Sequence, residues 1–328
     1  MSVKNVLEAH YIDISIPVLS RMQGVLPFDI YIKRSDRAYT KLFPKGEALD
    51  HARLTEYSVG KGVETLYVHK DDYKKYTFYV EQVAKILLEN ADRISAEDMS
   101  AVVKDMADLT MIEIFLTHHI DQDSMMHATM TMKGCVQVLA KQPRALVKVL
   151  KLLTWHPYQL KHSLACAIYS LLIAKLDGIT SDKILQNIAL GGFLHDLGMS
   201  KLSFDAEAKE DLTPQELKEI KEHPHLSKRI LDQLKQVPPE VRMIAFQHHE
   251  QPNGLGYPNG LYDKEIYYPA KIVSIADGFS ALTSPRPYRI EPYGALQALE
   301  LMAEDRGHFD SRLLSLFTSL FAKIAKAA

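Results

Sequence analysis

The residues with the clearest potential for chemistry are histidines and aspartates in the second half of the chain. The adjacent pair His248-His249 precedes a loop rich in glycine. Imidazole and carboxylate groups in this number suit first-row transition metals, with zinc, iron, manganese and nickel all eligible. The loop adds a backbone that can approach a polar substrate closely. The pattern predicts a metal-dependent hydrolase whose ligands are His162, His195, Asp196, His223, His248, His249 and Asp277.

Several of these residues have a simpler structural interpretation when taken alone. His162 could be a core or surface histidine of an amphipathic helix, and His223 could interact with a helix C-terminus. Asp277 is harder to explain in this way, because it lies within the apolar run Ile272–Ala281. An unpaired carboxylate in such surroundings costs several kcal/mol, and a bound cation removes that cost. We therefore expect the set to form a metal site.

Composition limits the class of protein. The chain has 328 residues, of which 47% are hydrophobic and 24% charged, as in globular proteins with a substantial core. A net charge of −2 gives no sign of a surface for nucleic acid polymers, so any phosphate site must be local. We expect no membrane span and a cytoplasmic location, since no signal peptide or long apolar segment is evident. Cys135 and Cys166 predict buried free thiols rather than a disulfide.

The first part of the chain differs in pattern from the rest. Residues 1–72 predict a small α/β module that receives a signal or a protein partner, and residues 73–150 predict a helical linker. An exposed face of the linker helices could form a homodimer. The elements expected in the module are a strand at Tyr11–Pro17, a hairpin of Phe28–Lys33 and Ala38–Phe43, a short helix at Leu49–Val59 and a strand at Glu64–Val68.

Residues 151–328 are expected to be helical and to hold the metal site. Adjacent residues such as His195 and Asp196 can serve one cluster if they lie at a helix end, where the second can turn inward. A capping box at Thr213 and prolines at helix starts help to define the boundaries. The expected helices are Leu160–Leu176, Ser181–His195, one after Thr213, one from Pro224 to about Leu234, Pro239–His249, Pro269–Leu282, Gly294–Ala303 and Asp310–Ala325.

These motifs resemble a known family. His195-Asp196, with histidines before and after it and Asp277 beyond, resembles the HD phosphohydrolase superfamily. The segment His248 to Leu261 (HHEQPNGLGYPNGL) narrows the resemblance to the HD-GYP branch of bacterial cyclic-di-GMP phosphodiesterases. The resemblance covers about Lys151 to Phe321 and is also carried by Ile275-Ala276-Asp277, Ala281–Ser284, Arg286–Arg289 and Gly307–Asp310.

The resemblance implies a mainly α fold, with an all-helical HD-GYP domain preceded by the α/β module and linking helices. It also implies a binuclear centre of two divalent metal ions, iron or alternatively manganese, held by the seven ligands with Asp196 as the bridge. Members with three metals carry a glutamate one turn before the first histidine. Because Tyr158 occupies that position here, we expect two metals.

The implied reaction is hydrolysis of cyclic-di-GMP to linear pGpG, with GMP as a further product to be tested. Two cations about 3.5–4 Å apart can share a water, lower its pKa and neutralise charge on the phosphoryl oxygens. Asp196 and Lys201 are the expected catalytic residues. The expected substrate-binding residues are Asn253, Gly256 and Tyr257 of the loop, with Arg286 and Arg289 holding phosphate.

The chain departs from the family pattern at several positions. Met199 stands where the family has a lysine, with Lys201 two residues later. Gln251, Asn253 and Ser280 also replace the family's residues. These departures leave two alternatives open. One is a catalytically impaired domain that acts as a cyclic-dinucleotide sensor or a signalling interaction protein, and the other is an HD hydrolase with another cyclic dinucleotide or a nucleotide phosphate as substrate.

Overall fold

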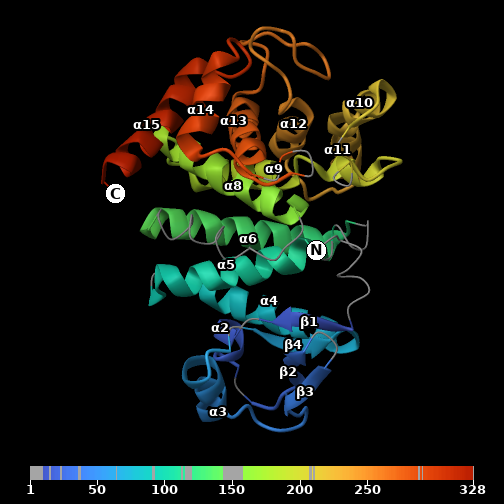
Figure 1. Cartoon of the computed structure of the whole chain (residues 1–328), viewed down its shortest axis with the longest axis vertical. Coiled ribbons are helices and arrows are strands. Elements are labelled where there is room, and N and C mark those ends of the chain that lie inside the picture. Colours follow the sequence, from blue (N-terminus) through green and yellow to red (C-terminus); the bar gives the residue numbers. More distant parts are fainter. Residues whose placement is uncertain are drawn as a thin grey trace.

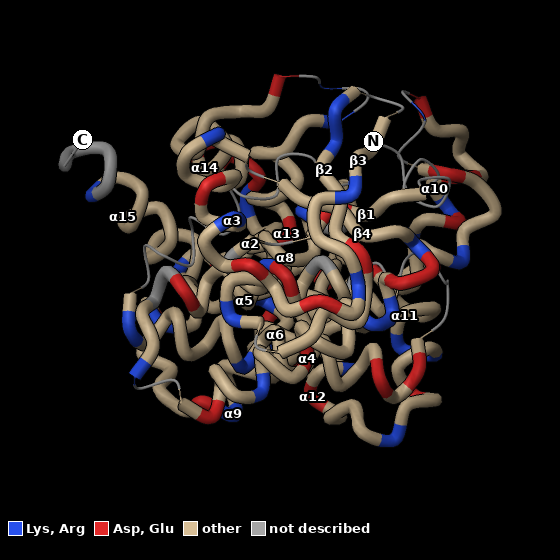
Figure 2. Tube along the Cα trace, turned by 90° about the horizontal axis from the view of Figure 1, so that it is seen from below, with Lys and Arg blue, Asp and Glu red and all other residues tan. Residues whose placement is uncertain are grey.

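The elements of the chain lie in layers (Figure 1). A small sheet with two short helices occupies one end, three long helices form the middle, and the helices of the second half of the chain form the other end. The computed structural model describes all residues except 1–9, 15, 23, 36–37, 64, 91–92, 112–113, 115–119, 143–157, 207–208, 210, 287–288, 290 and 328. Acidic and basic residues are interspersed along the described trace (Figure 2), in keeping with the small net charge.

The N-terminal sheet has four antiparallel strands in the order β1-β4-β2-β3. The strands are β1 (Tyr11–Ile14), β2 (Ile30–Ser35), β3 (Ala38–Phe43) and β4 (Leu66–His69). The expected hairpin of β2 and β3 is confirmed. The first strand is shorter than expected, because a turn of helix, α2 (Ile16–Leu19), begins before Pro17. Proline suits the first turn of a helix, where a missing N–H leaves no bond unmade.

The short helix expected at Leu49–Val59 divides into two parts. The first is α3 (His51–Thr55), whose N-terminus is capped by Asp50 through a 2.9 Å bond from the Arg53 N–H. The second is η1 (Glu56–Gly60), a wider π-helical turn in which the Lys61 N–H donates to the Glu56 carbonyl at 3.0 Å. The helix is therefore shorter than the sequence pattern predicts.

Three helices separate the sheet from the rest of the molecule. They are α4 (Tyr73–Glu89), α5 (Ala96–Met111) and α6 (Gln122–Lys141). The sheet and α4 share one apolar core with Val102, Met106 and Leu109 of α5, whereas Met99 and Val103 of α5 face a second core. The helix α5 thus contributes to both cores. The division of the chain at residues 72 and 150 stays a prediction.

The remaining helices match the expected ones to within a few residues at their ends. The Thr213 capping box is confirmed in both of its bonds, whereas Ser181 lies at an N-cap without a side-chain hydrogen bond. No described helix is both long and apolar enough to cross a membrane. The elements are α8 (Tyr158–Leu176), α9 (Asp182–Leu194), η5 (Leu197–Lys201), α10 (Pro214–Ile220), α11 (His223–Asp232), α12 (Pro239–Gln247), α13 (Tyr268–Thr283), α14 (Ala295–Glu304) and α15 (Ser311–Ala327).

Close packing of α9 against α12 brings the ends of these helices together. A Cβ atom on Gly191 would lie 2.6 Å from the Ile244 Cγ2, so the two helices approach as closely as they do because this residue is glycine. The helix α13 is buried over most of its length and packs against α8 and α9. This arrangement directs the ends of α9 and α12 and the middle of α8 and α13 toward one point.

Candidate metal centre

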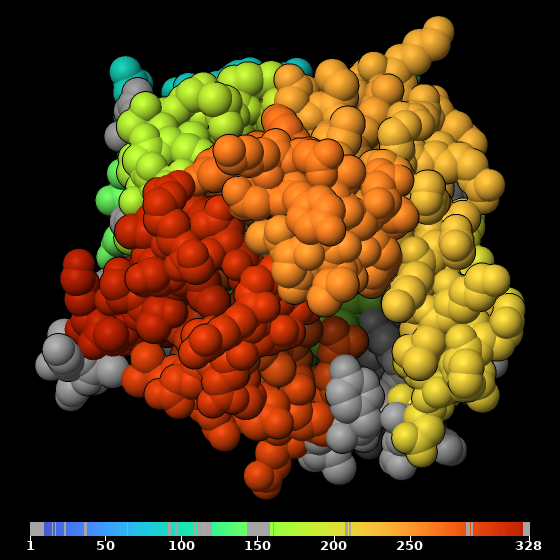
Figure 3. All heavy atoms as spheres, turned by 90° about the horizontal axis from the view of Figure 1, so that it is seen from above, coloured from blue at the N-terminus to red at the C-terminus, as the bar shows by residue number. Residues whose placement is uncertain are grey.

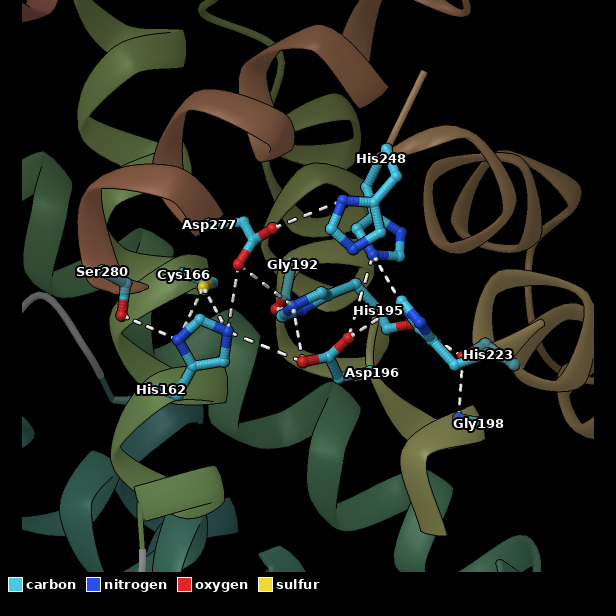
Figure 4. Close-up of polar contacts among 12 residues, drawn as sticks. His162, Cys166, Gly192, His195, Asp196, Gly198, His223, His248, Asp277 and Ser280 are labelled. Carbon is cyan, nitrogen blue, oxygen red and sulfur yellow. Dashed lines mark hydrogen bonds and ion pairs between the residues drawn. The ribbon is translucent and has the colours of Figure 1, made fainter. Parts of the chain in front are cut away.

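The seven side chains expected to bind metal converge from five helices or helix ends (Figure 4). His162 and Asp277 project from the interiors of α8 and α13. The other five lie at helix boundaries: His195 and Asp196 after α9, His223 at the start of α11, and His248 and His249 after α12. Within a helix, adjacent side chains point in different directions. At a helix end the backbone leaves the helical conformation, so two adjacent side chains can point toward the same cluster.

Asp196 lies between two groups of potential ligands. Its Oδ2 is 3.6 Å from the His162 Nε2 and 3.3 Å from the His195 Nε2. Its Oδ1 is 3.2 Å from the His223 Nε2 and 3.8 Å from the His248 Nε2. The two oxygens of one carboxylate therefore face different histidine pairs, which is the arrangement required of a bridging ligand.

Asp277 completes the first group and approaches the second. Its Oδ1 is 3.1 Å from the His162 Nε2, and its Oδ2 is 3.9 Å from the His249 Nδ1. The ligand atoms in each group lie within 4.8 Å of one another. One group is His162, Cys166, His195 and Asp277, and the other is Asp196, His223, His248 and His249.

The outer nitrogens of the histidines are held by acceptors away from the cluster. The Nδ1 of His195 lies 2.8 Å from the Gly192 carbonyl, that of His223 2.6 Å from the Ile220 carbonyl, and that of His248 2.9 Å from the Ala245 carbonyl. A carbonyl can only accept, so each Nδ1 carries the proton. Each Nε2 is then the nitrogen that points inward to the cluster, as in metal-binding histidines.

Burial and mutual interaction shift the pKa values within the cluster. Burial would raise the pKa of Asp277, but the neighbouring His162 outweighs it and holds that pKa below its usual range. Burial lowers the pKa of His249 to about 4, against the opposing effect of Asp277. Burial lowers the pKa of His195, but Asp196 reverses this and raises it to about 9. Asp277 is therefore ionised and His249 neutral, which are the forms that bind cations, whereas His195 would release a proton on binding one.

One buried atom indicates directly that a cation fits here. The His195 Nε2 is fully buried and makes no hydrogen bond of normal geometry among the described residues, although the Asp196 Oδ2 lies 3.3 Å away. Buried polar atoms nearly always have a partner, and an unsatisfied one costs about 1–3 kcal/mol. A metal ion among these nitrogens and carboxylate oxygens would satisfy it, so the donor set suits the centre implied by the sequence.

The family is established by comparison with known proteins. A sequence profile of the HD domain family matches residues 134–313, more than half of the chain. The chain belongs to the HD domain family. Over the whole chain, the fold is similar to that of an HDG"Y"P protein from Bdellovibrio bacteriovorus, with a TM-score of 0.67 and 20% identity, covering 95% of this chain and 99% of that one. At this identity the likeness shows the fold alone.

Three curated relatives narrow the comparison. The chain is 33% identical over 179 residues to a cyclic di-GMP phosphodiesterase of Pseudomonas aeruginosa, covering 54% of this chain and 42% of the relative. It is 34% identical over 144 residues to the cyclic di-GMP phosphodiesterase response regulator RpfG of Xanthomonas campestris, covering 43% and 38%. It is 38% identical over 138 residues to the 3'3'-cGAMP-specific phosphodiesterase 3 of Vibrio cholerae, covering 40% and 29%.

These comparisons confirm the resemblance to the HD-GYP branch. The chain spans less than half the length of the three relatives, at 42%, 38% and 29%. The family match begins at residue 134, within α6, whereas the sequence pattern places the domain boundary at residue 151.

The loop after α12 of the HD-GYP domain is held by a buried carboxylate. Glu250 accepts hydrogen bonds from the Asn259 N–H at 2.7 Å and the Leu261 N–H at 2.8 Å. A Cβ atom on Gly256 would lie 2.3 Å from the Gln251 nitrogen, so the folded loop accepts only glycine at this position. The loop therefore has a fixed shape beside the metal cluster.

Of the loop residues expected to bind substrate, Tyr257 is placed beside the cluster. Its ring stacks on His249 with centroids 4.7 Å apart, and its N–H donates to the His249 carbonyl at 3.1 Å. Gly256 is needed for the loop fold, and its contact with substrate stays a prediction. Asn253 also holds the backbone, since its side chain accepts from the Leu255 N–H at 2.9 Å and its own N–H donates to the Gly307 carbonyl at 3.0 Å.

The two arginines expected to hold phosphate have different surroundings. The Arg286 guanidinium lies 3.8 Å from the centroid of the Tyr158 ring, and Tyr158 stacks on His162 at 5.1 Å. Arg286 therefore lies close to the cluster. Arg289 donates to the carbonyls of Ala281 and Ser284 at the end of α13, so it stabilises that helix end.

The segment around Met199 forms the short helix η5 after Asp196. Met199 is half-buried in η5, while Lys201, the residue expected to supply the missing cation, is exposed at the end of the same element. Catalytic use of Lys201 therefore stays a prediction.

Ser280, one of the departures from the family pattern, contacts His162. The Ser280 hydroxyl lies 3.0 Å from the His162 Nδ1. We expect Ser280→Ala to weaken metal binding about tenfold, because His162 would lose the contact that fixes its ring. Titration of metal-free protein with Mn²⁺ measures the change. Ser274→Ala, elsewhere on α13, is the control, and equal affinities in the two variants would contradict the assigned role.

Glu250 gives a second prediction. Glu250→Gln replaces one of two accepting oxygens with an NH₂ group, which cannot accept the Asn259 or Leu261 N–H. The free energy of unfolding should fall by about 1–3 kcal/mol, since a buried donor is left unpaired. Urea unfolding measures it. Glu265→Gln is the matched control, because Glu265 accepts from the Tyr262 N–H at an exposed site. A loss no larger than that of the control would argue against this role for Glu250.

Proposed function

We propose that the chain is a metal-dependent phosphodiesterase that hydrolyses cyclic-di-GMP to linear pGpG. The observation that carries the proposal is the position of Asp196, whose two oxygens face separate groups of ligands. This suits a binuclear centre of iron, with manganese as the alternative. The substrate follows from the relatives named cyclic di-GMP phosphodiesterases, at 33% and 34% identity.

The residues of the chain divide the work of such a reaction. Two divalent cations held here would supply a water of lowered pKa and charge to stabilise the phosphoryl oxygens. Asp196 would hold the two positions at a fixed separation, and the outer contacts of the histidines would keep their Nε2 atoms directed inward. Arg286 provides a guanidinium at the edge of the cluster, suited to a phosphate oxygen.

The two tyrosines beside the cluster add hydrogen-bond donors. Burial raises the pKa of both Tyr158 and Tyr257 well above the usual value of the phenol. Each phenol therefore keeps its proton and can donate to a phosphate or ribose oxygen. Tyr257 would also shield His249 from solvent on one side, because the two rings are stacked.

The test is to load the purified chain with iron or manganese, add cyclic-di-GMP and separate the products by chromatography. Linear product that disappears when a chelator removes the metal supports the proposal. Tight binding without product would instead favour a sensor, the interpretation to which Met199 points. Neither binding nor product, with the metal present, would overturn cyclic-di-GMP as the substrate.

A second substrate is included in the same assay. The chain is 38% identical over 138 residues to a relative named as specific for 3'3'-cGAMP. That molecule also carries two phosphodiester bonds but has one adenine in place of a guanine. A higher kcat/KM for 3'3'-cGAMP than for cyclic-di-GMP would reassign the substrate while leaving the reaction type unchanged.

A further inference from the structure

A lysine lies beside the metal cluster on the side of His249. Lys221 is the C-cap residue of α10, and its Nζ lies 5.7 Å from the centroid of the Tyr257 ring. That ring stacks on the ring of His249 with centroids 4.7 Å apart. Figure 3 shows a hollow between the yellow segment that includes α10 and α11 and the orange segment that includes the loop after α12. Lys221 and Tyr257 belong to the two segments that border this hollow.

The cluster is accessible to solvent at some of its ligands and closed at others. The side chains of His249 and Asp196 are 27% and 22% exposed, whereas that of His195 is fully buried. The exposed ligands mark where a substrate can reach a metal ion held by the cluster. Tyr257 and Lys221 lie beside one of them, so they border the path of a substrate to the centre.

The charge of Lys221 is not neutralised by a carboxylate. Lys228 and Lys271 each pair with an aspartate, at 2.6 and 2.5 Å, whereas Lys221 forms no ion pair with an acidic side chain among the described residues. The face of a tyrosine ring attracts a cation through its quadrupole and carries no net charge. Tyr257 can therefore hold the ammonium group near the cluster and leave its positive charge to attract an anion.

We propose that Lys221 binds a phosphate of the cyclic dinucleotide on the His249 side of the centre. The proposal rests on the proposed function and adds a substrate-binding residue from outside the metal ligands and the glycine-rich loop. A cyclic dinucleotide has two phosphodiester groups, each with a negative charge. Arg286 lies over the Tyr158 ring beside His162, which belongs to the other group of ligands. Two cations placed in this way suit a substrate with two anionic groups.

The backbone fixes the position from which the Lys221 side chain extends. Its N–H donates to the Leu217 carbonyl at 3.2 Å, and the Glu222 N–H donates to the Glu219 carbonyl at 3.0 Å. His223, one of the expected metal ligands, follows two residues after Lys221 at the start of α11. These bonds do not involve the lysine side chain, so Lys221→Ala should keep the fold of the segment.

The experiment compares Lys221→Ala with the wild type in hydrolysis of cyclic-di-GMP by manganese-loaded protein. We expect KM to rise about tenfold with a smaller change in kcat, because a charge-assisted contact with the substrate is lost. The KM of the variant should also depend less on salt concentration, since salt screens the charge that has been removed. Lys221→Arg should restore most of the affinity. Lys218→Ala is the matched control, because Lys218 is an exposed lysine in the preceding turn of α10.

The outcomes separate the role of Lys221 from the function itself. If the wild type binds cyclic-di-GMP without turnover, calorimetry makes the same comparison, and a rise in Kd of about tenfold supports the role. A KM or Kd no different from that of Lys218→Ala would overturn it and leave the proposed function intact. A rise that Lys221→Arg does not reverse, with unchanged salt dependence, would show a structural role and overturn it as well. A wild type that neither binds nor hydrolyses the substrate would overturn both.

Discussion

Asp196→Ala is expected to abolish hydrolysis of cyclic-di-GMP, with a loss in kcat of about 1,000-fold or more. The carboxylate is within 3.3 Å of the His195 Nε2 on one side and 3.2 Å of the His223 Nε2 on the other. Removing it takes away the group that joins the two halves of the centre. The metal content should fall with the activity, because the two halves lose the one carboxylate that both share.

The effect is measured by chromatography of the products, together with metal analysis and circular dichroism of the same sample. Asp232→Ala is the control, since Asp232 is an exposed aspartate of α11 that pairs with Lys228 at 2.6 Å. It should retain full activity. A folded Asp196→Ala variant with activity within tenfold of the wild type would contradict the assignment of Asp196 as the bridge.

Gly198→Ala is expected to have the second largest effect. The turn that follows Asp196 lies against α11 so closely that a Cβ atom on Gly198 would be 2.1 Å from the His223 carbonyl oxygen and 2.8 Å from the Ser227 nitrogen. Both obstacles are backbone atoms, so a rotamer change cannot relieve the clash. The turn and α11 must therefore move apart, and with them Asp196 and His223.

A displacement of this kind should lower kcat/KM about 100-fold, as misplacement of reacting groups by about 1 Å does. Overpacking should also lower the free energy of unfolding by about 1–3 kcal/mol. The displacement would also strain two hydrogen bonds of the Ser227 hydroxyl. It accepts from the Gly198 N–H at 2.8 Å and donates to the His195 carbonyl at 2.7 Å.

Kinetics and urea unfolding of the same preparation measure the two effects. Gly294→Ala is the matched control, because Gly294 is the N-cap of α14 and an added Cβ there would have no atom within 4 Å. It should change neither quantity appreciably. If Gly198→Ala behaved like this control, the close approach of η5 and α11 would not be needed to position the centre.

The local elements of the fold could be predicted from the sequence because their causes are local. The Thr213 capping box needs only Thr213 and Glu216, which are three residues apart, and both of its bonds form. The pairing of β1 with β4 joins Tyr11 to His69 and depends on packing over many residues. No short pattern encodes that pairing, so the sequence pattern predicts the strands but not their order.

The metal cluster could be anticipated for a different reason. Burying the carboxylate of Asp277 within an apolar helix costs free energy unless a cation or polar partner lies beside it. Histidines elsewhere in the chain could supply such partners or bind a shared cation. The roles of Asn253 and Arg289 could not be anticipated in this way. Each depends on a backbone carbonyl that the fold brings near, that of Gly307 for Asn253 and that of Ala281 for Arg289.

Cys135 and Cys166 are both buried free thiols, as their places in apolar helical patterns predict. The location of the chain in the cytoplasm, a protein partner for the N-terminal module and dimer formation all stay predictions from the sequence.

We propose that Asp196 and the six side chains around it hold two divalent metal ions, and metal analysis tests this most directly. The purified chain is saturated with Fe²⁺ under anaerobic conditions, freed of unbound metal and analysed by mass spectrometry for iron per chain. The arrangement of two ligand groups about one carboxylate predicts two equivalents. One equivalent or none would contradict it.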